Sequence, residues 1–288
     1  MFKKQYNYYL NLVEEYLESL PFEESLICRS MNYSLNGGGK RIRPVLALAC
    51  VELVGGQPVK FVREAVALEL IHTYSLIHDD LPSMDNADYR RGKLANHKVF
   101  GEAIAILAGD ALLTMAFELL SQPLSIPAER QLRVIREVAS AAGYKGMVGG
   151  QVLDTFNNIE INTIADIEEI HSLKTGALLT AAARLGAILG GGTEKEIEKV
   201  TRYAADIGLA FQIRDDILDV IGDSAILGKP NGSDQKLNKK TYPYLLGLEG
   251  ANTKLRETIE SAKEAIQSFG PKAAFLELLA DYVAERQN

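Results

Sequence analysis

The sequence of 288 residues contains no tryptophan and only two cysteines, Cys28 and Cys50. Two cysteines in a chain of this length do not form the disulfide framework on which small secreted domains depend, so we expect both to be reduced thiols in the core. The first residues also lack the apolar core of a signal peptide. These absences argue against a disulfide-stabilised secreted domain and predict a cytoplasmic protein.

Long apolar runs and an excess of basic residues are lacking as well. The longest apolar candidate, residues 178–190, is interrupted by Arg184, so we expect no stable insertion into a membrane. The formal net charge of −7 argues against general binding of nucleic acid, although a local basic patch could still bind a small anion. No linker, low-complexity tract or repeat divides the chain, so we interpret residues 1–288 as one domain.

Alternating strand patterns are hard to find, whereas apolar residues recur at helical spacing almost throughout the chain. We therefore predict an all-α fold, in which a central layer of helices is wrapped by others. The predicted helices cover residues 3–19, 40–54, 58–80, 95–121, 127–149, 163–190, 193–221, 239–247, 252–268 and 271–286.

Two acidic clusters, residues 79–85 and 215–219, each follow a long apolar stretch. The stretches 65–77 and 203–213 are apolar around most of the helical circumference, which is typical of buried helices. Buried carboxylates are costly unless cations neutralise them. The sequence therefore predicts bound metal, bound basic side chains or both, with the two clusters facing one shared cation site.

The spacing within each cluster refines this prediction. Asp215 and Asp219 are four positions apart and share a helix face. Asp79 and Asp85 would diverge on a regular helix, but Pro82 interrupts it, so we expect a helix end near Asp80 and a turn that brings Asp85 back. Carboxylate ligands favour Mg²⁺ or Mn²⁺ over zinc.

Basic residues gather in four places that accompany the acidic clusters. These are residues 40–43 after three glycines, Arg90 with Arg91, Lys174, and Lys229 followed by Lys239 and Lys240. Glycines expose the backbone to an anion, a helix N-terminus adds partial positive charge, and Lys or Arg add charge-assisted hydrogen bonds. The pattern predicts a polyanion site that suits a diphosphate. A Walker loop is excluded because Arg41 follows Lys40 and no strand precedes it.

These motifs carry a resemblance to a known family. They are GGKRIRP at 38–44, SLIHDDLPSMD at 75–85, RRG at 90–92, KTGAL at 174–178 and FQIRDDILD at 211–219, followed by GK at 228–229 and NKKTY at 238–242. In this order they resemble the short-chain trans-prenyl diphosphate synthases, most closely the bacterial members that form farnesyl diphosphate. Ala87 stands where some relatives carry another acid, and no core motif departs from the pattern.

The resemblance implies an all-helical bundle around a deep central cavity, usually as a homodimer, that condenses isopentenyl diphosphate with an allylic diphosphate. Mg²⁺ would be held by Asp79, Asp85 and Asp215, with Asp80, Asp216 and Asp219 as further ligands or their supports. Arg90, Lys174 and Lys229 would stabilise the leaving diphosphate. Lys40, Arg43, His72 and Arg91 would hold isopentenyl diphosphate, and Thr175 and Gln212 would face the allylic substrate. His72 also has a positional argument, since it lies seven residues before Asp79 and so within about 20° of the same helix face.

Product length is expected to depend on the helix that precedes the first acidic cluster. Tyr74 lies five residues before Asp79, between one and two turns of about 5.4 Å, so its ring could form the floor of the pocket, with Ser75 beside it. Relatives that make farnesyl diphosphate carry a similar aromatic residue at this offset. We therefore predict farnesyl diphosphate as the product, with geranylgeranyl diphosphate as the alternative. We also expect the loop 228–236 to be mobile and to bring Lys229 over the metal-bound diphosphate.

Three other functions compete with this interpretation. Glu69-x-x-His72 and Glu168-x-x-His171 resemble the motifs of di-iron carboxylate bundles, but that function leaves both aspartate clusters and every basic cluster unexplained. A terpene cyclase would not need the basic residues 40–43. A noncatalytic subunit of a prenyl synthase should have lost its acidic clusters, and both are intact here.

Overall fold

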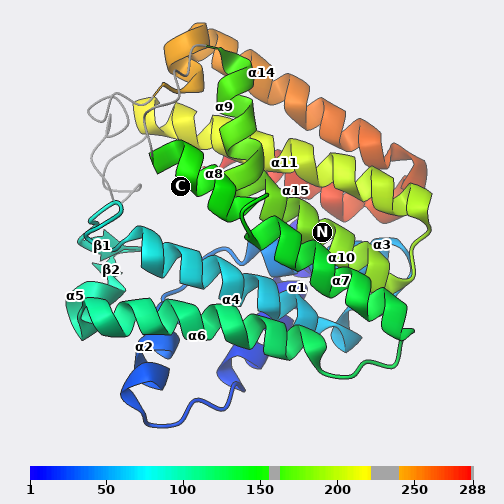
Figure 1. Ribbon diagram of the computed structural model, residues 1–288. Coiled ribbons are helices and arrows are strands. Elements are labelled where there is room, and N and C mark those ends of the chain that lie inside the picture. Colours follow the sequence, from blue (N-terminus) through cyan, green and yellow to red (C-terminus); the bar gives the residue numbers. More distant parts are fainter. Residues whose placement is uncertain (156–162, 222–239, 287–288) are drawn as a thin grey trace.

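The computed structural model describes residues 1–155, 163–221 and 240–286, which are helical almost throughout (Figure 1). The first α-helices are α1 (Phe2–Glu18), α2 (Leu26–Leu35), α3 (Ile42–Leu53), α4 (Val62–Asp79), α5 (Asn96–Phe100), α6 (Glu102–Ser121), α7 (Ala128–Ala142) and α8 (Met147–Thr155). They are followed by α9 (Ile164–His171), α10 (Ala177–Gly190), α11 (Glu194–Ile221), α14 (Tyr242–Ile266) and α15 (Ala274–Glu285). Shorter elements are the 3-10 helices η1 (Pro58–Lys60) and η3 (Gln267–Ala273), the π-helical turn η2 (Ser172–Gly176), and the antiparallel strands β1 (Tyr89–Arg90) and β2 (Lys93–Leu94). The all-α prediction is confirmed.

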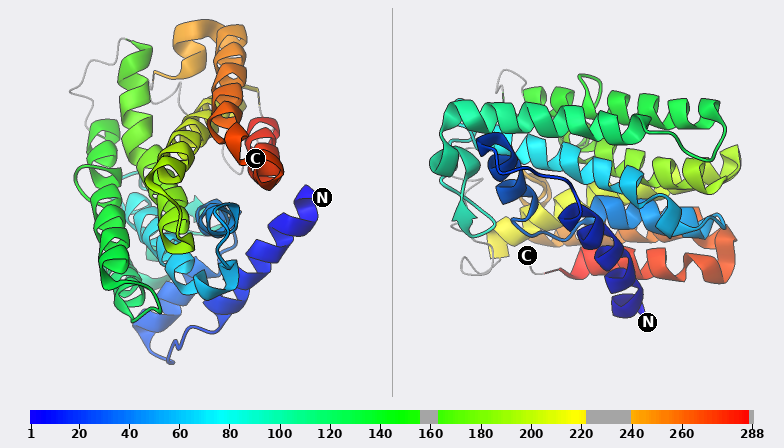
Figure 2. Two further views of the ribbon diagram at one scale, coloured as in Figure 1. Left: turned by 90° about the vertical axis from the view of Figure 1, so that its right-hand side faces the viewer. Right: turned by 90° about the horizontal axis from the view of Figure 1, so that it is seen from below.

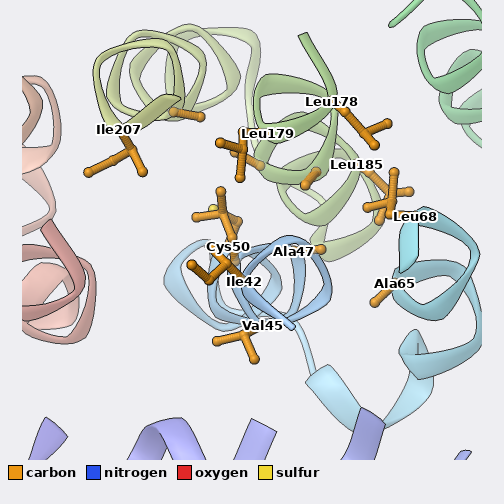
Figure 3. Close-up of a cluster of buried hydrophobic side chains, with 14 of the residues drawn as sticks. Ile42, Val45, Ala47, Cys50, Ala65, Leu68, Leu178, Leu179, Leu185 and Ile207 are labelled. Atoms are coloured by element: carbon orange, nitrogen blue, oxygen red, sulfur yellow. The ribbon is translucent and has the colours of Figure 1, made fainter. Parts of the chain in front are cut away.

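Helix α3 forms the centre of the bundle, because every one of its residues except Arg43 and Glu52 is buried. Figure 3 shows its side chains between those of α10 and α11 on one side and those of α4 on another. Gly186 of α10 allows this close packing, since a Cβ atom there would lie 2.0 Å from the carbonyl oxygen of Ala47. A helix that is apolar on all faces thus occupies the core, as its sequence indicates.

The other helices wrap this centre in pairs (Figures 1 and 2). Helix α4 packs along α6, α11 packs along α14, and α10 contacts α3, α7 and α11. The predicted apolar stretches of α4 and α11 are buried in these contacts. Because both helices carry an acidic cluster at their C-terminal ends, the packing determines where those clusters lie.

Several predicted boundaries were wrong. The helix predicted over 95–121 is split into α5 and α6 at Gly101, whose φ of 84° is unfavourable for other residues. The helix predicted over 127–149 is interrupted between α7 and α8, whereas the two predicted over 239–268 are joined as α14, with a non-helical Gly247 inside it. Helix α2 was missed, although the hydroxyl of Ser25 caps it by accepting from the backbone N–H of Cys28 (3.2 Å).

Helix α6 is the one helix in the described part of the chain that is long and apolar enough to cross a membrane. Only 39% of its apolar window is buried, because α2 and α4 cover one face and leave the other open. Leu107 (53% exposed) lies on the open face. Helix α6 is therefore a core helix on one side and carries an exposed apolar surface on the other.

Candidate active site

The first acidic cluster begins where α4 ends, at Asp79. The backbone N–H of Asp85 donates to the carbonyl oxygen of Asp79 (2.9 Å), and the N–H of Ala87 donates to that of Asp80 (3.2 Å). These bonds close a tight turn around Pro82 and return Asp85, with an exposed side chain, to the end of the helix. The predicted turn is confirmed.

The two adjacent carboxylates of this cluster have different surroundings. Asp80 is buried and its Oδ1 accepts a hydrogen bond from Nε of Arg90 (3.0 Å). Burial raises the pKa of Asp79 to about 6, while Lys174 opposes this shift and the neighbouring Asp85 adds to it. A bound cation would stabilise the ionised form of Asp79 and offset this cost.

The second acidic cluster lies near the C-terminal end of α11. Oδ1 of Asp215 is 2.6 Å from Nη2 of Arg286, so a cationic side chain balances this carboxylate. Oδ2 of Asp216 accepts the backbone N–H of Tyr242, the first residue of α14 (3.0 Å). Asp219 is buried one turn further along α11. The adjacent residues Asp215 and Asp216 thus have different partners.

The donor set consists of carboxylate oxygens, which suit a hard cation. Two of these carboxylates, Asp80 and Asp215, are paired with Arg90 and Arg286. Within residues 1–155, 163–221 and 240–286, however, no three His, Cys, Asp or Glu side chains converge closely enough to hold one ion. The set Asp79, Asp80, Asp85, Asp215, Asp216 and Asp219 therefore stays a prediction. Lys229 and the predicted lid at 228–236 lie outside the described residues.

A cationic cavity of about 440 Å³ lies between α3, α4 and η2. The predicted binding residues Lys40, Arg43, His72, Arg91 and Thr175 all line it. Burial lowers the pKa of Arg43 to about 10, so the guanidinium stays charged at neutral pH. Burial, together with Arg43 and Arg91, lowers the pKa of His72 well below its usual value, so this imidazole is neutral. The cavity is suited to an anion with several negative charges.

A second, more apolar cavity of about 550 Å³ adjoins the first. Arg43, His72 and Thr175 line both cavities, which places the cationic and apolar parts next to each other. The second cavity has Asp79 and Lys174 in its lining and includes the predicted length-determining residues Tyr74 and Ser75. Further lining residues are apolar side chains of α6 and α8, among them Ile106, Met147, Val148 and Val152.

Lys174 is carried by the π-helical turn η2, an irregularity that is common at functional sites. Its Nζ lies 2.5 Å from Oδ2 of Asp154 on α8. Gly150 permits the two segments to touch, since a Cβ atom there would lie 2.2 Å from the backbone nitrogen of Lys174. The turn therefore projects Lys174 toward the second cavity from a backbone that packs directly on α8.

A sequence model of polyprenyl synthetases matches residues 24–275. The chain belongs to the polyprenyl synthetase family. It is 49% identical over 262 residues to a farnesyl diphosphate synthase of Geobacillus stearothermophilus, covering 90% of this chain and 88% of that one. It is 51% identical over 278 residues to geranylgeranyl pyrophosphate synthase 11 of Arabidopsis thaliana, covering 94% and 78%. A structure of a farnesyl/geranylfarnesyl (FPP/GFPP) synthase from Zymomonas mobilis superposes with a TM-score of 0.86 at 35% identity, with 98% of each chain covered.

The resemblance found in the sequence is thereby confirmed, and so is prenyltransferase activity at the level of the family. The two Glu-x-x-His motifs that resemble those of di-iron proteins have other partners in this polyprenyl synthetase. Oε1 of Glu69 lies 2.8 Å from Arg41, and Oε1 of Glu168 lies 2.8 Å from Lys254. The ring of His171 packs beside that of Tyr242, at 5.8 Å between centroids. The two motifs thus form separate structural contacts.

Three contacts of the site were not predicted. Asp154 pairs with Lys174, Arg286 pairs with Asp215, and Arg41 pairs with Glu69. Each joins residues that lie far apart in the sequence, so no local spacing indicates it. Gln212, in contrast, was predicted to face the allylic substrate, but it is half-buried on α11 and does not line either cavity within the described residues. Its role stays a prediction.

Proposed function

We propose that this prenyltransferase makes (2E,6E)-farnesyl diphosphate, by condensing isopentenyl diphosphate first with dimethylallyl diphosphate and then with geranyl diphosphate. The observation that carries the proposal is the junction of the two cavities at Arg43, His72 and Thr175. The cationic cavity suits the diphosphate of isopentenyl diphosphate. The apolar cavity suits the hydrocarbon tail of the allylic substrate, whose diphosphate would lie near Asp79 and Lys174.

The reaction breaks the C–O bond of the allylic diphosphate, and the diphosphate leaves with the electron pair. The double bond of isopentenyl diphosphate then forms the new C–C bond to the allylic carbon, and a proton is lost from the isopentenyl unit to the released diphosphate. No side-chain base is needed for this sequence. The chain contributes cations: Arg90, Lys174 and Lys229 toward the leaving diphosphate, and Lys40, Arg43 and Arg91 toward isopentenyl diphosphate.

The carboxylates fit Mg²⁺, with Mn²⁺ as a substitute. Asp79, Asp85 and Asp215 would hold the ions, while Asp80, Asp216 and Asp219 would be further ligands or orient them. When bound, Mg²⁺ would stabilise the negative charge that develops on the leaving diphosphate. The all-oxygen donor set supports this choice over zinc.

Tyr74 supports fifteen carbons as the product length. It lies five residues before Asp79 on α4, about 7.5 Å along the helix axis, and its buried ring is part of the apolar cavity wall. The ring of His78 packs against it edge-on, with 5.6 Å between centroids. Geranylgeranyl diphosphate is the second candidate product, because relatives with that name reach 51% identity.

We also propose that two copies associate through the exposed apolar face of α6, which carries Leu107. An apolar helix face of this kind is typical of an oligomer interface. The mass in solution, measured by light scattering for the wild type and for Leu107→Glu, tests this.

A cytoplasmic location is consistent with the two free cysteines, Cys28 and Cys50.

The proposal is tested by measuring diphosphate release with Mg²⁺, isopentenyl diphosphate and one allylic partner at a time. Dimethylallyl and geranyl diphosphate should both support turnover, whereas farnesyl diphosphate should not. Turnover with farnesyl diphosphate at a comparable rate would favour the geranylgeranyl product instead. Absence of turnover with every partner would overturn the proposal.

A further inference from the structure

Arg41 differs from the other basic residues of the motif at 38–44. Lys40, Arg41 and Arg43 all line the cationic cavity, but Arg41 is only 2% exposed and its guanidinium is bound to protein acceptors. Its backbone is left-handed, with φ 50° and ψ 35°, a conformation that is uncommon for residues other than glycine. Such a residue persists only where surrounding contacts hold it.

The contacts of Arg41 use its whole guanidinium group. Nε lies 2.8 Å from Oε1 of Glu14 on α1, Nη1 lies 2.8 Å from Oε1 of Glu69 on α4, and Nη2 donates to the carbonyl oxygen of Leu35 (2.6 Å). The planar fork of arginine suits acceptors arranged in this way. These bonds connect the loop before α3 to α1, α2 and α4.

Glu69 is the member of this cluster that matters for the cavity. It is 1% exposed, it lies three residues before His72 on α4, and it is part of the cavity lining together with Arg43 and Arg91. Its negative charge acts on both arginines, since Glu69 raises the pKa of Arg43 and of Arg91 against the lowering effect of burial. A buried carboxylate therefore lies within electrostatic reach of the cations expected to bind the diphosphate.

We propose that Arg41 is a positioning residue that neutralises Glu69 and so leaves Arg43 and Arg91 available for the diphosphate of isopentenyl diphosphate. This inference rests on the proposed function of the cavity. Without Arg41, the buried carboxylate of Glu69 would have to recruit another cation. Arg43 is suited to this, because its buried Nε has no hydrogen-bond partner in the described structure. An Arg43 drawn onto Glu69 would be lost to the substrate.

Other contacts hold the loop independently of Arg41. The hydroxyl of Tyr6 donates to the carbonyl oxygen of Lys40, and Nη1 of Arg91 donates to that of Gly38. Removing the charge of Arg41 should therefore not by itself unfold the loop. Substituting Glu69 together with Arg41 separates the two effects, because the double variant lacks both the cation and the carboxylate that it balances.

The test compares Arg41→Met, Glu69→Gln and the double variant Arg41→Met/Glu69→Gln. Arg41→Met should raise the KM for isopentenyl diphosphate at least about tenfold while the KM for geranyl diphosphate changes less than about twofold, and the double variant should recover most of the loss. Calorimetric titration with inorganic diphosphate should likewise show weaker binding by Arg41→Met than by the wild type and the double variant. Equal KM values for wild type and Arg41→Met, or a double variant as impaired as the single one, would overturn the inference.

Arg63→Met is the matched control. Arg63 also pairs with a buried glutamate on α4, Glu64 (2.7 Å, 1% exposed), but neither residue lines the two cavities. This variant should lower the melting temperature and leave both KM values unchanged. If Arg41→Met does not fold, the double variant Arg41→Met/Glu69→Gln decides: a KM for isopentenyl diphosphate within about twofold of the wild-type value supports the inference, and a KM raised about tenfold or more contradicts it. If the wild type does not condense the substrates, the proposed function fails, while the diphosphate titration still tests the charge balance of the cavity.

Discussion

Nζ of Lys174 lies 2.5 Å from Oδ2 of Asp154, so the cation that faces the apolar cavity is held by a carboxylate on a neighbouring helix. Both side chains are about one quarter exposed, at 27% and 23%. The pair therefore contributes little to overall stability, because solvent screens it. Its importance lies in the direction in which it holds the ammonium group of Lys174.

We expect Asp154→Asn to reduce kcat/KM for geranyl diphosphate about 10- to 100-fold, since small displacements of a catalytic group have effects of this size. The melting temperature should change little. Steady-state kinetics with the allylic substrate varied provide the measurement. Glu168→Gln is the control, because Glu168 on α9 forms an ion pair of similar length and exposure with Lys254 on α14, and neither residue lines the two cavities. Equal losses in the two variants would show that the pair does not position Lys174.

Removal of a predicted metal ligand should abolish turnover with limited loss of fold. Asp215→Ala is expected to lower kcat by about 100-fold or more, the scale seen when an electrostatic contribution to the transition state is lost. Asp79→Ala should behave alike, and chelation of the divalent ion should have the same effect on the wild type. Asp206→Ala on the same helix α11 is the control and should remain active. Full activity of Asp215→Ala at saturating Mg²⁺ is the result that would refute the metal-binding role.

The parts of this site that were predictable from the sequence are those carried by local patterns. The apolar run before Asp79 predicts the buried helix α4, and Pro82 predicts the turn after it; both are present. The cationic residues that line the first cavity were predicted because each belongs to a contiguous motif. Residue type and spacing along the chain are sufficient to predict such local features.

Other features depend on tertiary contacts and were missed for that reason. Arg286 reaches Asp215 from the end of the described chain, and its guanidinium lies 3.7 Å from the centroid of the Phe211 ring. The hairpin that carries Arg90 and Arg91 was missed for a different, local reason: its turn lacks the usual Asn-Gly signal, although Arg91 and Gly92 both adopt positive φ. The opposite behaviour of Arg41 and Arg43 within one motif is likewise set by Glu14 and Glu69 on other helices.

Lys40 should give binding of isopentenyl diphosphate a pH dependence. Burial lowers the pKa of Lys40 to about 8, Arg286 lowers it further, and Asp215 opposes the shift. The ammonium form attracts a diphosphate and the neutral amine does not, so the KM for isopentenyl diphosphate should rise as the pH increases through about 8. Lys40→Arg keeps its charge and should move this rise to higher pH. Identical pH profiles for the two proteins would exclude Lys40 as the titrating group.

Tyr74 is held at its place in the apolar cavity by its neighbours. The ring of His78 packs edge-on against it, and Nε2 of His78 lies 3.0 Å from the carbonyl oxygen of Ile106 on α6. Gly109 leaves the room for this arrangement, because a Cβ atom there would lie 2.1 Å from Nε2 of His78. A product tail growing along α4 would therefore meet a ring with little freedom to move.

The length of the product distinguishes the two candidate products and tests the role of Tyr74. Labelled isopentenyl diphosphate and geranyl diphosphate are incubated with Mg²⁺ and the enzyme, and the dephosphorylated products are separated by chromatography. The wild type should give a fifteen-carbon alcohol, and Tyr74→Ala should give alcohols of twenty carbons or more, with a loss of stability of about 3 kcal/mol from the cavity. A wild type that makes twenty carbons, or a folded Tyr74→Ala variant that still stops at fifteen, would contradict the assignment of Tyr74 as the residue that ends chain growth.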